Sequence, residues 1–219
     1  MLINEELTVH ARFFYDIVCP YAYLASTQIE RLVADTGAEI EWVPMLLGGI
    51  FRAHQAPQVP AQHMTPAKAR MNTLDLSRWA ERWDVPFHFS PHHPQRTVEA
   101  MRLLCLTPPE LRPQVSARLF KEYWAERARL DEVLLNRVAD DFGLLERWQT
   151  HRDEAKAQLF TNTEIAVSLG IFGAPSFEVN GEIFWGQDRL EFVHRALGGA
   201  PTSIVEGQAP KSTIVEIFH

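Results

Sequence analysis

The stretch that decides the fold is residues 173–190, Gly-Ala-Pro-Ser-Phe-Glu-Val-Asn-Gly-Glu-Ile-Phe-Trp-Gly-Gln-Asp-Arg-Leu. Residues 176–179 and 182–185 are rich in aromatic and β-branched side chains, and Asn180-Gly181 between them tolerates the positive φ angles of a type I′ turn. This pattern predicts a β-hairpin. Pro175 has no N–H to donate and suits the start of the first strand, and we predict a cis bond between Ala174 and Pro175.

The N-terminal part of the chain predicts a β-α-β unit. Residues 9–17 have the composition of a buried strand, and residues 21–36 have the periodicity of an amphipathic helix that ends near Gly37. Residues 39–43 then alternate polar and apolar side chains, as a half-buried strand does.

Helical periodicity dominates the middle of the chain. It predicts helices over 66–83, 95–106, 112–128, 131–149 and 153–169, separated by proline-rich joints, and a last helix over 188–197. The order of elements predicts an α/β, thioredoxin-like fold with a large all-helical insertion. We assign residues 9–45 and 171–199 to the thioredoxin-like domain, 46–170 to the insertion and 200–219 to a C-terminal tail. Within the tail, residues 212–218 suit either an extra strand or an arm to a partner subunit.

Composition excludes several classes of partner. A chain of 219 residues with 46% hydrophobic side chains is long enough to bury one substantial core. The formal net charge of −7 leaves no basic field for nucleic acid or an anionic membrane surface. Residues 1–6 lack the features of a secretory signal, and no apolar run is long enough to span a bilayer. We therefore expect a soluble cytoplasmic protein.

The two cysteines, Cys19 and Cys105, have different surroundings in the sequence. A reducing compartment disfavours a disulfide between them. Cys19 falls where the first strand ends and the first helix begins, so helix N–H groups can stabilise a thiolate, or another anionic sulfur beside it. Ala22 occupies the position of a resolving thiol, which disfavours a dithiol cycle. The alternative is that Cys19 is only a small buried hydrophobe. Cys105 fits that alternative, and we assign it to the core.

Four segments together resemble one family. They are residues 13–26 (FFYDIVCPYAYLAS), 45–52 (MLLGGIFR), 65–84 (TPAKARMNTLDLSRWAERWD) and 171–190 (IFGAPSFEVNGEIFWGQDRL). The set resembles the 2-hydroxychromene-2-carboxylate isomerase and kappa-class glutathione transferase family, a DsbA-like branch of the thioredoxin superfamily. The resemblance implies glutathione as cofactor, a small electrophilic substrate and a homodimer. It also implies a serine at the position where this chain has Cys19.

The resemblance also implies roles for individual residues. The backbone of Ala174, before Pro175, would pair with the cysteinyl part of glutathione, as an added strand does. Asp188 and the backbone at Gln187 would bind the γ-glutamyl end, and Lys68 the glycyl carboxylate. Asp188 has a plain alternative as a helix N-cap, and Lys68 as a surface charge. The family often has an asparagine after Gly48-Gly49, but none lines up here.

The aromatic and histidine side chains near these segments have more ordinary explanations. Tyr21 and Tyr23 flank Cys19 and would shape an aromatic substrate pocket, whereas Tyr15 is assigned to the core. Trp79 and Trp83 have the spacing of a packed helix face. The cluster of His88, His92 and His93 lacks a cysteine or acidic ligand at zinc spacing, so we expect no metal.

Three functions remain open from the sequence. The first is a glutathione-dependent isomerase or transferase that acts on a small aromatic or unsaturated electrophile. The second is a glutathione-linked thiol-disulfide oxidoreductase or peroxidase that uses Cys19, and the third is a non-catalytic glutathione-binding protein. The first two differ in whether Cys19 steadies the glutathione thiolate or forms a mixed disulfide with it.

Overall fold

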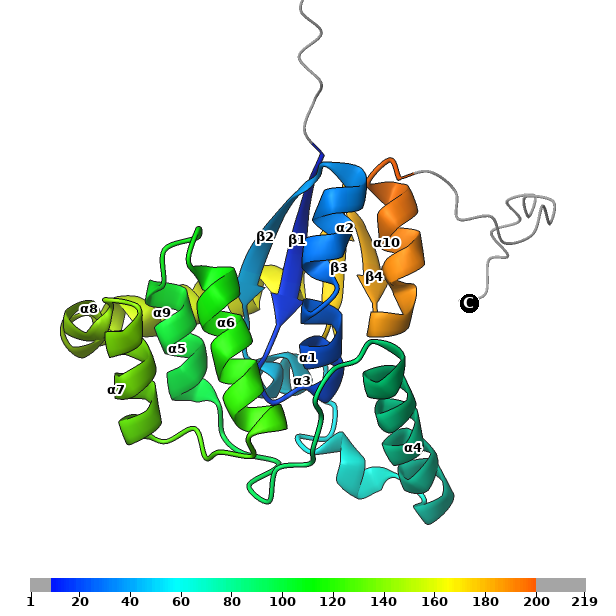
Figure 1. Cartoon of the computed structure of the whole chain (residues 1–219), viewed down its shortest axis with the longest axis horizontal. Coiled ribbons are helices and arrows are strands. Elements are labelled where there is room, and N and C mark those ends of the chain that lie inside the picture. The colour runs from blue at the N-terminus through cyan, green and yellow to red at the C-terminus, as the bar shows by residue number, and fades with distance from the viewer. Residues whose placement is uncertain (1–8, 200–219) are drawn as a thin grey trace, which may run out of the picture.

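The computed structural model describes residues 9–199, in which four strands form one sheet surrounded by helices (Figure 1). The strands are β1 (His10–Tyr15), β2 (Glu39–Pro44), β3 (Ser176–Val179) and β4 (Glu182–Trp185). The helices are α1 (Pro20–Ser26), α2 (Ile29–Thr36), α3 (Leu47–Ala53), α4 (Pro66–Arg82), α5 (Val98–Leu106), α6 (Arg112–Phe120), α7 (Glu132–Asp141), α8 (Leu145–Thr150), α9 (Arg152–Ser168) and α10 (Leu190–Ala196). Short helical turns η1 (Pro60–His63), η2 (Lys121–Ala125) and η3 (Gln187–Arg189) complete the set.

The sheet has the strand order β2-β1-β3-β4. β1 pairs with β2 in parallel, while β3 pairs antiparallel with both β1 and β4. A parallel pair needs a crossover between its strands, and α1 and α2 supply it. The predicted thioredoxin-like fold with a helical segment between its halves is confirmed.

The hairpin predicted over residues 176–185 is present. Asn180 and Gly181 have φ angles of 51° and 86°, as both central residues of a type I′ turn require. The bond between Ala174 and Pro175 is cis, as predicted.

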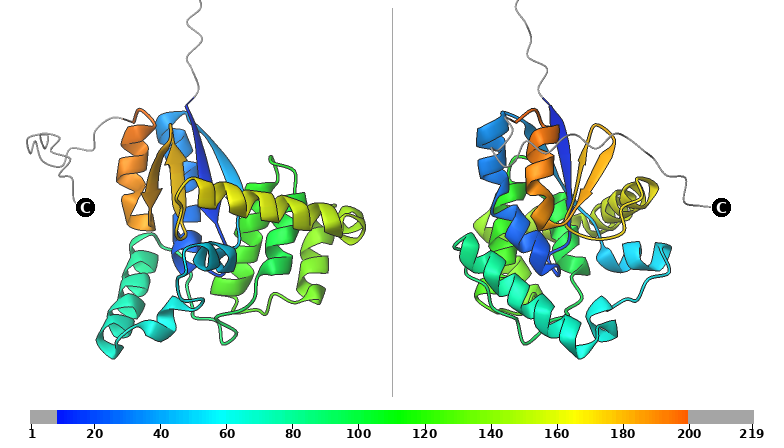
Figure 2. Two further views of the ribbon diagram at one scale, coloured as in Figure 1. Left: turned by 180° about the vertical axis from the view of Figure 1, so that it is seen from behind. Right: turned by 90° about the vertical axis from the view of Figure 1, so that its right-hand side faces the viewer.

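The helices lie on both faces of the sheet and beyond one edge. In Figure 1, α1, α2 and α10 lie in front of the sheet, and Figure 2, seen from behind, shows α9 crossing the opposite face. α5, α6, α7 and α8 gather beyond β2, while α4 extends past the end of the sheet where α1 begins.

One hydrophobic core joins the sheet to the helices that follow it. Phe13 stacks on Phe177 of β3 with ring centroids 4.9 Å apart and meets Trp42 of β2 edge-on at 5.0 Å. Trp124, in η2, donates its indole N–H to the carbonyl of Ile17 at 2.9 Å. The contact ties the middle of the chain to the loop after β1. A division into domains at residues 46 and 170 remains our proposal.

Two predicted helices are broken. The helix predicted over 21–36 stops at Ser26, because Ser26 and Thr27 donate their hydroxyls to the carbonyls of Tyr23 and Leu24 and compete with the helical ladder. The helix predicted over 131–149 divides at Gly143, which has a φ of 69° and ends α7. α3 and η1 were not predicted at all.

The tail lies outside the described residues, and so does the strand or arm considered for residues 212–218. Within residues 9–199, no helix is both long and apolar enough to cross a membrane.

Candidate functional site

Cys19 lies at the junction between sheet and helices. It directly precedes α1, where Pro20 is the first helical residue and has no N–H to leave unpaired. The backbone N–H of Cys19 donates to the carbonyl of Asp16 at 3.0 Å, which closes a tight turn after β1. Cys19 as a whole is 7% exposed. The sulfur is therefore held at the end of the sheet, almost out of solvent.

The thiol of Cys19 donates a hydrogen bond to the carbonyl oxygen of Ala174 at 3.1 Å. Sheet register explains the contact, because Phe14 in β1 pairs with Ser176 in β3 and the chain before β3 passes over the loop after β1. The carbonyl of Pro175 accepts the N–H of Gly186 at 2.9 Å, which fixes the same bend from the other side. Cys19 and the Ala174-Pro175 segment thus form one local site.

Burial keeps Cys19 protonated. The pKa of the thiol is raised to about 12, mainly because burial removes it from water, and the negative charge of Asp16 contributes to the rise. The backbone N–H groups of Ala22 and Tyr21 lower the pKa, but by less than burial raises it. The start of α1 therefore does not make Cys19 a thiolate. At neutral pH this side chain is a hydrogen-bond donor.

Tyr21 connects the Cys19 segment to α4. Its phenol donates to Oδ1 of Asn72 at 2.6 Å, and α1 packs against α4. Burial is the main cause that raises the pKa of Tyr21 to about 12, and the nearby charges of Asp75 and Asp188 add to it. Tyr21 is half-buried and remains protonated at neutral pH. It borders the same site as Cys19.

Lys68 lies on the exposed surface of the first turn of α4. Its backbone N–H donates to Oγ1 of Thr65, the N-cap of the helix, at 3.3 Å. Asn72, which binds Tyr21, follows one turn later on the same helix. This places Lys68 on the element that borders Tyr21, with its charged group toward solvent.

Gln187 and Asp188 lie in η3, which packs against α1. Gln187 is buried, whereas Asp188 is exposed and pairs with Arg189 at 2.8 Å. Asp188 is not the N-cap of α10, because Arg189 occupies that position. The plain alternative of a helix cap is therefore wrong. The Asp188 carboxylate is one of the charges that raise the pKa of Tyr21, and η3, which carries it, packs against α1.

Tyr23 does not border an open pocket. Its side chain is buried, its ring stacks on Phe120 at 5.7 Å, and its phenol donates to the carbonyl of Pro86 at 2.9 Å. Residue i+2 on a helix points away from residue i, which explains why Tyr21 and Tyr23 face different surroundings. We therefore remove Tyr23 from the candidate substrate pocket.

The residues assigned to packing lie where expected. Tyr15 is fully buried and shares a hydrogen bond of 2.6 Å with Ser116. Cys105 is a free buried thiol that accepts from Nδ2 of Asn162 at 3.8 Å. Trp79 and Trp83 pack together with ring centroids 4.7 Å apart. In residues 9–199, no group of three or more His, Cys, Asp or Glu side chains could hold a metal ion.

Sequence reasoning missed one functional candidate beside Cys19. Asp16 is 1% exposed, and its carboxylate accepts hydrogen bonds from three different segments. A charged residue at the end of an apolar strand, three positions before Cys19, was the available signal. In the segment after Gly48-Gly49, His54 is a residue with a contact to the chain that leads to Ala174. Its Nε2 lies 3.0 Å from the carbonyl oxygen of Ile171.

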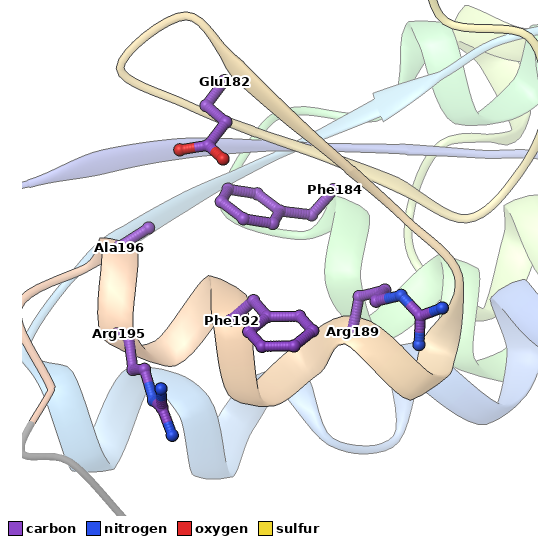
Figure 3. A pocket seen from close by; sticks show the side chains of 6 residues that line it. All are labelled: Glu182, Phe184, Arg189, Phe192, Arg195 and Ala196. Atoms are coloured by element: carbon purple, nitrogen blue, oxygen red, sulfur yellow. The ribbon is translucent and has the colours of Figure 1, made fainter. Parts of the chain in front are cut away.

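A separate groove of about 550 Å³ lies between β4 and α10 (Figure 3). Phe184 and Phe192 form its two apolar sides, and Arg189, Arg195 and Glu182 lie at its rim. Its lining does not include Cys19, Ala174 or Tyr21. We do not assign this groove to the thiol site.

Comparison with known proteins agrees with the resemblance seen in the sequence. The family model of the DSBA-like thioredoxin domain matches residues 11–198. A 2-hydroxychromene-2-carboxylate isomerase of Pseudomonas sp. (strain C18) is 26% identical over 211 residues, which cover 93% of this chain and 97% of that protein. The glutathione S-transferase kappa 2 of Caenorhabditis elegans is 26% identical over 202 residues, which cover 82% and 87% of the two chains.

The solved structure of a 2-hydroxychromene-2-carboxylate isomerase has the same fold. It superposes with a TM-score of 0.75 at 21% identity and covers 86% of this chain and 94% of that chain. This chain therefore shares its overall fold with that solved structure.

Proposed function

Because this chain belongs to the DsbA-like thioredoxin family, we propose that it is a glutathione-dependent isomerase or transferase that acts on a small aromatic or unsaturated electrophile. Of the two relatives named above, one is an isomerase and the other a glutathione transferase. The observation that carries the proposal is the contact of 3.1 Å between the protonated thiol of Cys19 and the carbonyl of Ala174.

The contact supports a glutathione site because it joins a thiol donor to a backbone carbonyl directly before β3. In this proposal the cysteinyl part of glutathione pairs with the backbone of Ala174 as a short added strand. The glutathione sulfur then lies beside Cys19, which turns its S–H from Ala174 toward that sulfur. Pro175 fixes the bend that presents Ala174.

The two charged ends of glutathione need partners on either side of Cys19. We assign the γ-glutamyl ammonium group to the exposed carboxylate of Asp188 and its carboxylate to the backbone at Gln187 and Asp188. Lys68, on α4, is assigned to the glycyl carboxylate. η3 and α4 both pack against α1, which supports a tripeptide that spans the start of that helix.

The chemistry we propose uses the glutathione thiolate as the nucleophile. The sulfur adds to a conjugated double bond, a C–S bond forms, and the π electrons move onto the carbonyl oxygen of the substrate. The former double bond now rotates as a single bond. When the electrons return, the C–S bond breaks, the double bond forms again and the thiolate leaves. A transferase would keep the C–S bond: a proton from water would neutralise the enolate after conjugate addition, and chloride would leave when the electrophile is an aryl chloride. Tyr21, protonated at neutral pH, borders the place where the substrate would lie.

The oxidoreductase alternative receives less support. Ala22, fully buried, stands where a resolving thiol would lie. The raised pKa of Cys19 leaves little thiolate to attack a disulfide, since the thiolate is the nucleophile in that exchange. Both observations favour a Cys19 that steadies another sulfur over a Cys19 that attacks one.

The test combines binding with turnover. Isothermal calorimetry should show that glutathione and S-methylglutathione both bind, because the ends of the tripeptide carry recognition. Isomerisation of 2-hydroxychromene-2-carboxylate, followed by absorbance, should require glutathione and should not proceed with S-methylglutathione. Conjugation of 1-chloro-2,4-dinitrobenzene tests the transferase branch. Absence of glutathione binding would overturn the proposal, and binding without either reaction would favour a non-catalytic glutathione-binding protein.

We also propose a homodimer, as the family resemblance implies. Sedimentation equilibrium of the whole chain should give twice the monomer mass of 25.1 kDa. A monomer at micromolar concentration would contradict it.

A further inference from the structure

A buried carboxylate lies directly behind the Cys19 loop. Asp16 is the first residue after β1 and is 1% exposed. Its hydrogen-bond partners in the described residues are neutral backbone and hydroxyl groups, and burial raises the pKa of its carboxyl. Burying a carboxyl without a cation is costly unless hydrogen bonds compensate. The hydrogen bonds that the Asp16 carboxylate accepts offset this cost.

The hydrogen bonds of Asp16 join three segments. Oδ1 accepts the N–H of Val18 at 3.1 Å, within the Cys19 loop itself, and the hydroxyl of Thr97 at 2.7 Å. Oδ2 accepts the N–H of Leu47 at 3.0 Å. Thr97 directly precedes α5, and Leu47 is the first residue of α3. One carboxylate therefore fixes the loop after β1 to the starts of two helices.

The same residue sets the position of Cys19 through its backbone. The carbonyl of Asp16 accepts the N–H of Cys19 at 3.0 Å. Side chain and main chain of Asp16 thus act on the same four-residue turn, the first by anchoring Val18 and the second by anchoring Cys19. A shift of this turn would move the Cys19 sulfur relative to Ala174.

We propose that Asp16 is a positioning residue that holds the Cys19 thiol against Ala174 by tying its loop to α3 and α5. The catalytic consequence rests on the function proposed above. The positional claim does not, because it concerns the thiol in the absence of glutathione.

The sharpest variant is Asp16→Asn. Asparagine has the same shape, but its NH₂ group cannot accept the second backbone N–H, so either Leu47 or Val18 keeps an unpaired buried donor. We expect the Cys19 loop to open locally. Cys105 serves as an internal reference, since it is a second buried thiol outside the loop.

The experiment measures alkylation of both thiols by iodoacetamide, with glutathione absent and each cysteine peptide quantified by mass spectrometry. Asp16→Asn should raise the alkylation rate of Cys19 by about tenfold relative to that of Cys105, because an unpaired buried donor favours local opening and because loss of the Asp16 charge lowers the pKa of the thiol. Thr97→Val removes one hydrogen bond to the same carboxylate and should raise the ratio by a smaller factor, about threefold. Thr97→Val keeps that charge, so a higher ratio in Thr97→Val reports local opening alone.

The matched control is Ser116→Ala, which removes a buried hydrogen bond to Tyr15 that does not touch the Cys19 loop. It should leave the ratio of the two rates unchanged. If Asp16→Asn raises both rates by one common factor, its role is general stability and the proposal is overturned. Should Asp16→Asn fail to fold, Thr97→Val decides in its place, and an unchanged ratio there contradicts the proposal equally.

Discussion

The thiol of Cys19 donates to the carbonyl oxygen of Ala174, although 155 positions of sequence separate the two residues. The pairing of β1 with β3 brings them together, and the loop held by Asp16 aims the sulfur at the carbonyl. Burial keeps Cys19 protonated, so its thiol is a hydrogen-bond donor. In our proposal, this donor lies beside the glutathione sulfur, and the backbone of Ala174 pairs with the glutathione backbone.

Asp188→Asn should weaken glutathione binding by about tenfold, since a hydrogen bond to a charged group contributes ~1.5–3 kcal/mol and this one is partly exposed. Calorimetry at low and high salt measures the effect. Asp35→Asn is the control, because Asp35 is an exposed acid paired with Arg31 on α2, with 48% of its side chain exposed against 40% for Asp188. If the Asp188→Asn protein and the parent bind glutathione with the same Kd, Asp188 is not part of the glutathione site.

Tyr21→Phe and Tyr23→Phe make the same chemical change at two positions of α1 whose side chains have different surroundings. Tyr21→Phe should lower kcat/KM for the electrophile by about tenfold and leave the Kd for glutathione unchanged, because it removes a donor beside the substrate region. Tyr23→Phe breaks only the hydrogen bond to Pro86 and should lower the free energy of unfolding by about 1 kcal/mol without changing kcat/KM. Steady-state kinetics and urea unfolding separate the two outcomes. A loss of kcat/KM in Tyr23→Phe but not in Tyr21→Phe would reverse our assignment.

Stability should fall in alkaline solution, because buried thiols must stay protonated in the folded state. Burial raises the pKa of Cys19 and Cys105 from 9.0 to about 12. Above pH 9.0 the unfolded chain loses these protons first, so the folded state binds more protons and the free energy of unfolding decreases. Each thiol contributes up to ~1.4 kcal/mol per pH unit.

Urea unfolding at pH 8, 9 and 10 measures this slope. Cys19→Ser should show a shallower slope than the parent, since serine does not titrate in this range. Tyr15, whose pKa is also raised by burial, is present in both proteins and cancels in the comparison. Equal slopes in the two proteins would show that the Cys19 thiol is free to ionise in the folded state.

Local patterns were enough to predict the parts of the fold that depend on neighbours in sequence. The alternating strands around Asn180-Gly181 and the β-α-β unit both follow from periodicity and turn chemistry. The break after Ser26 was missed because it depends on hydroxyls that bond to carbonyls within the helix. α3 was missed because it is short and contains Gly48-Gly49, which oppose a helix by propensity.

The site was less accessible to sequence than the fold. The family resemblance implied a common glutathione site for Cys19 and Ala174, and the pairing of β1 with β3 brings the two residues into contact. The role of Asp16 could not be predicted, because its partners Thr97 and Leu47 are distant in sequence and only the folded chain brings them to its carboxylate. Tyr23 was assigned to the pocket by its nearness to Cys19 in sequence, whereas helical geometry turns it into the core.

The turnover of Cys19→Ser with glutathione tests the central claim most directly. If glutathione supplies the nucleophile and Cys19 only donates a hydrogen bond, serine, the stronger donor, should retain or increase turnover of 2-hydroxychromene-2-carboxylate or 1-chloro-2,4-dinitrobenzene. Cys19→Ala, measured beside it, should lose about 10²-fold, the effect of removing one well-placed donor. A Cys19→Ser protein that binds glutathione normally but is as inactive as Cys19→Ala would contradict the account and make Cys19 itself the nucleophile.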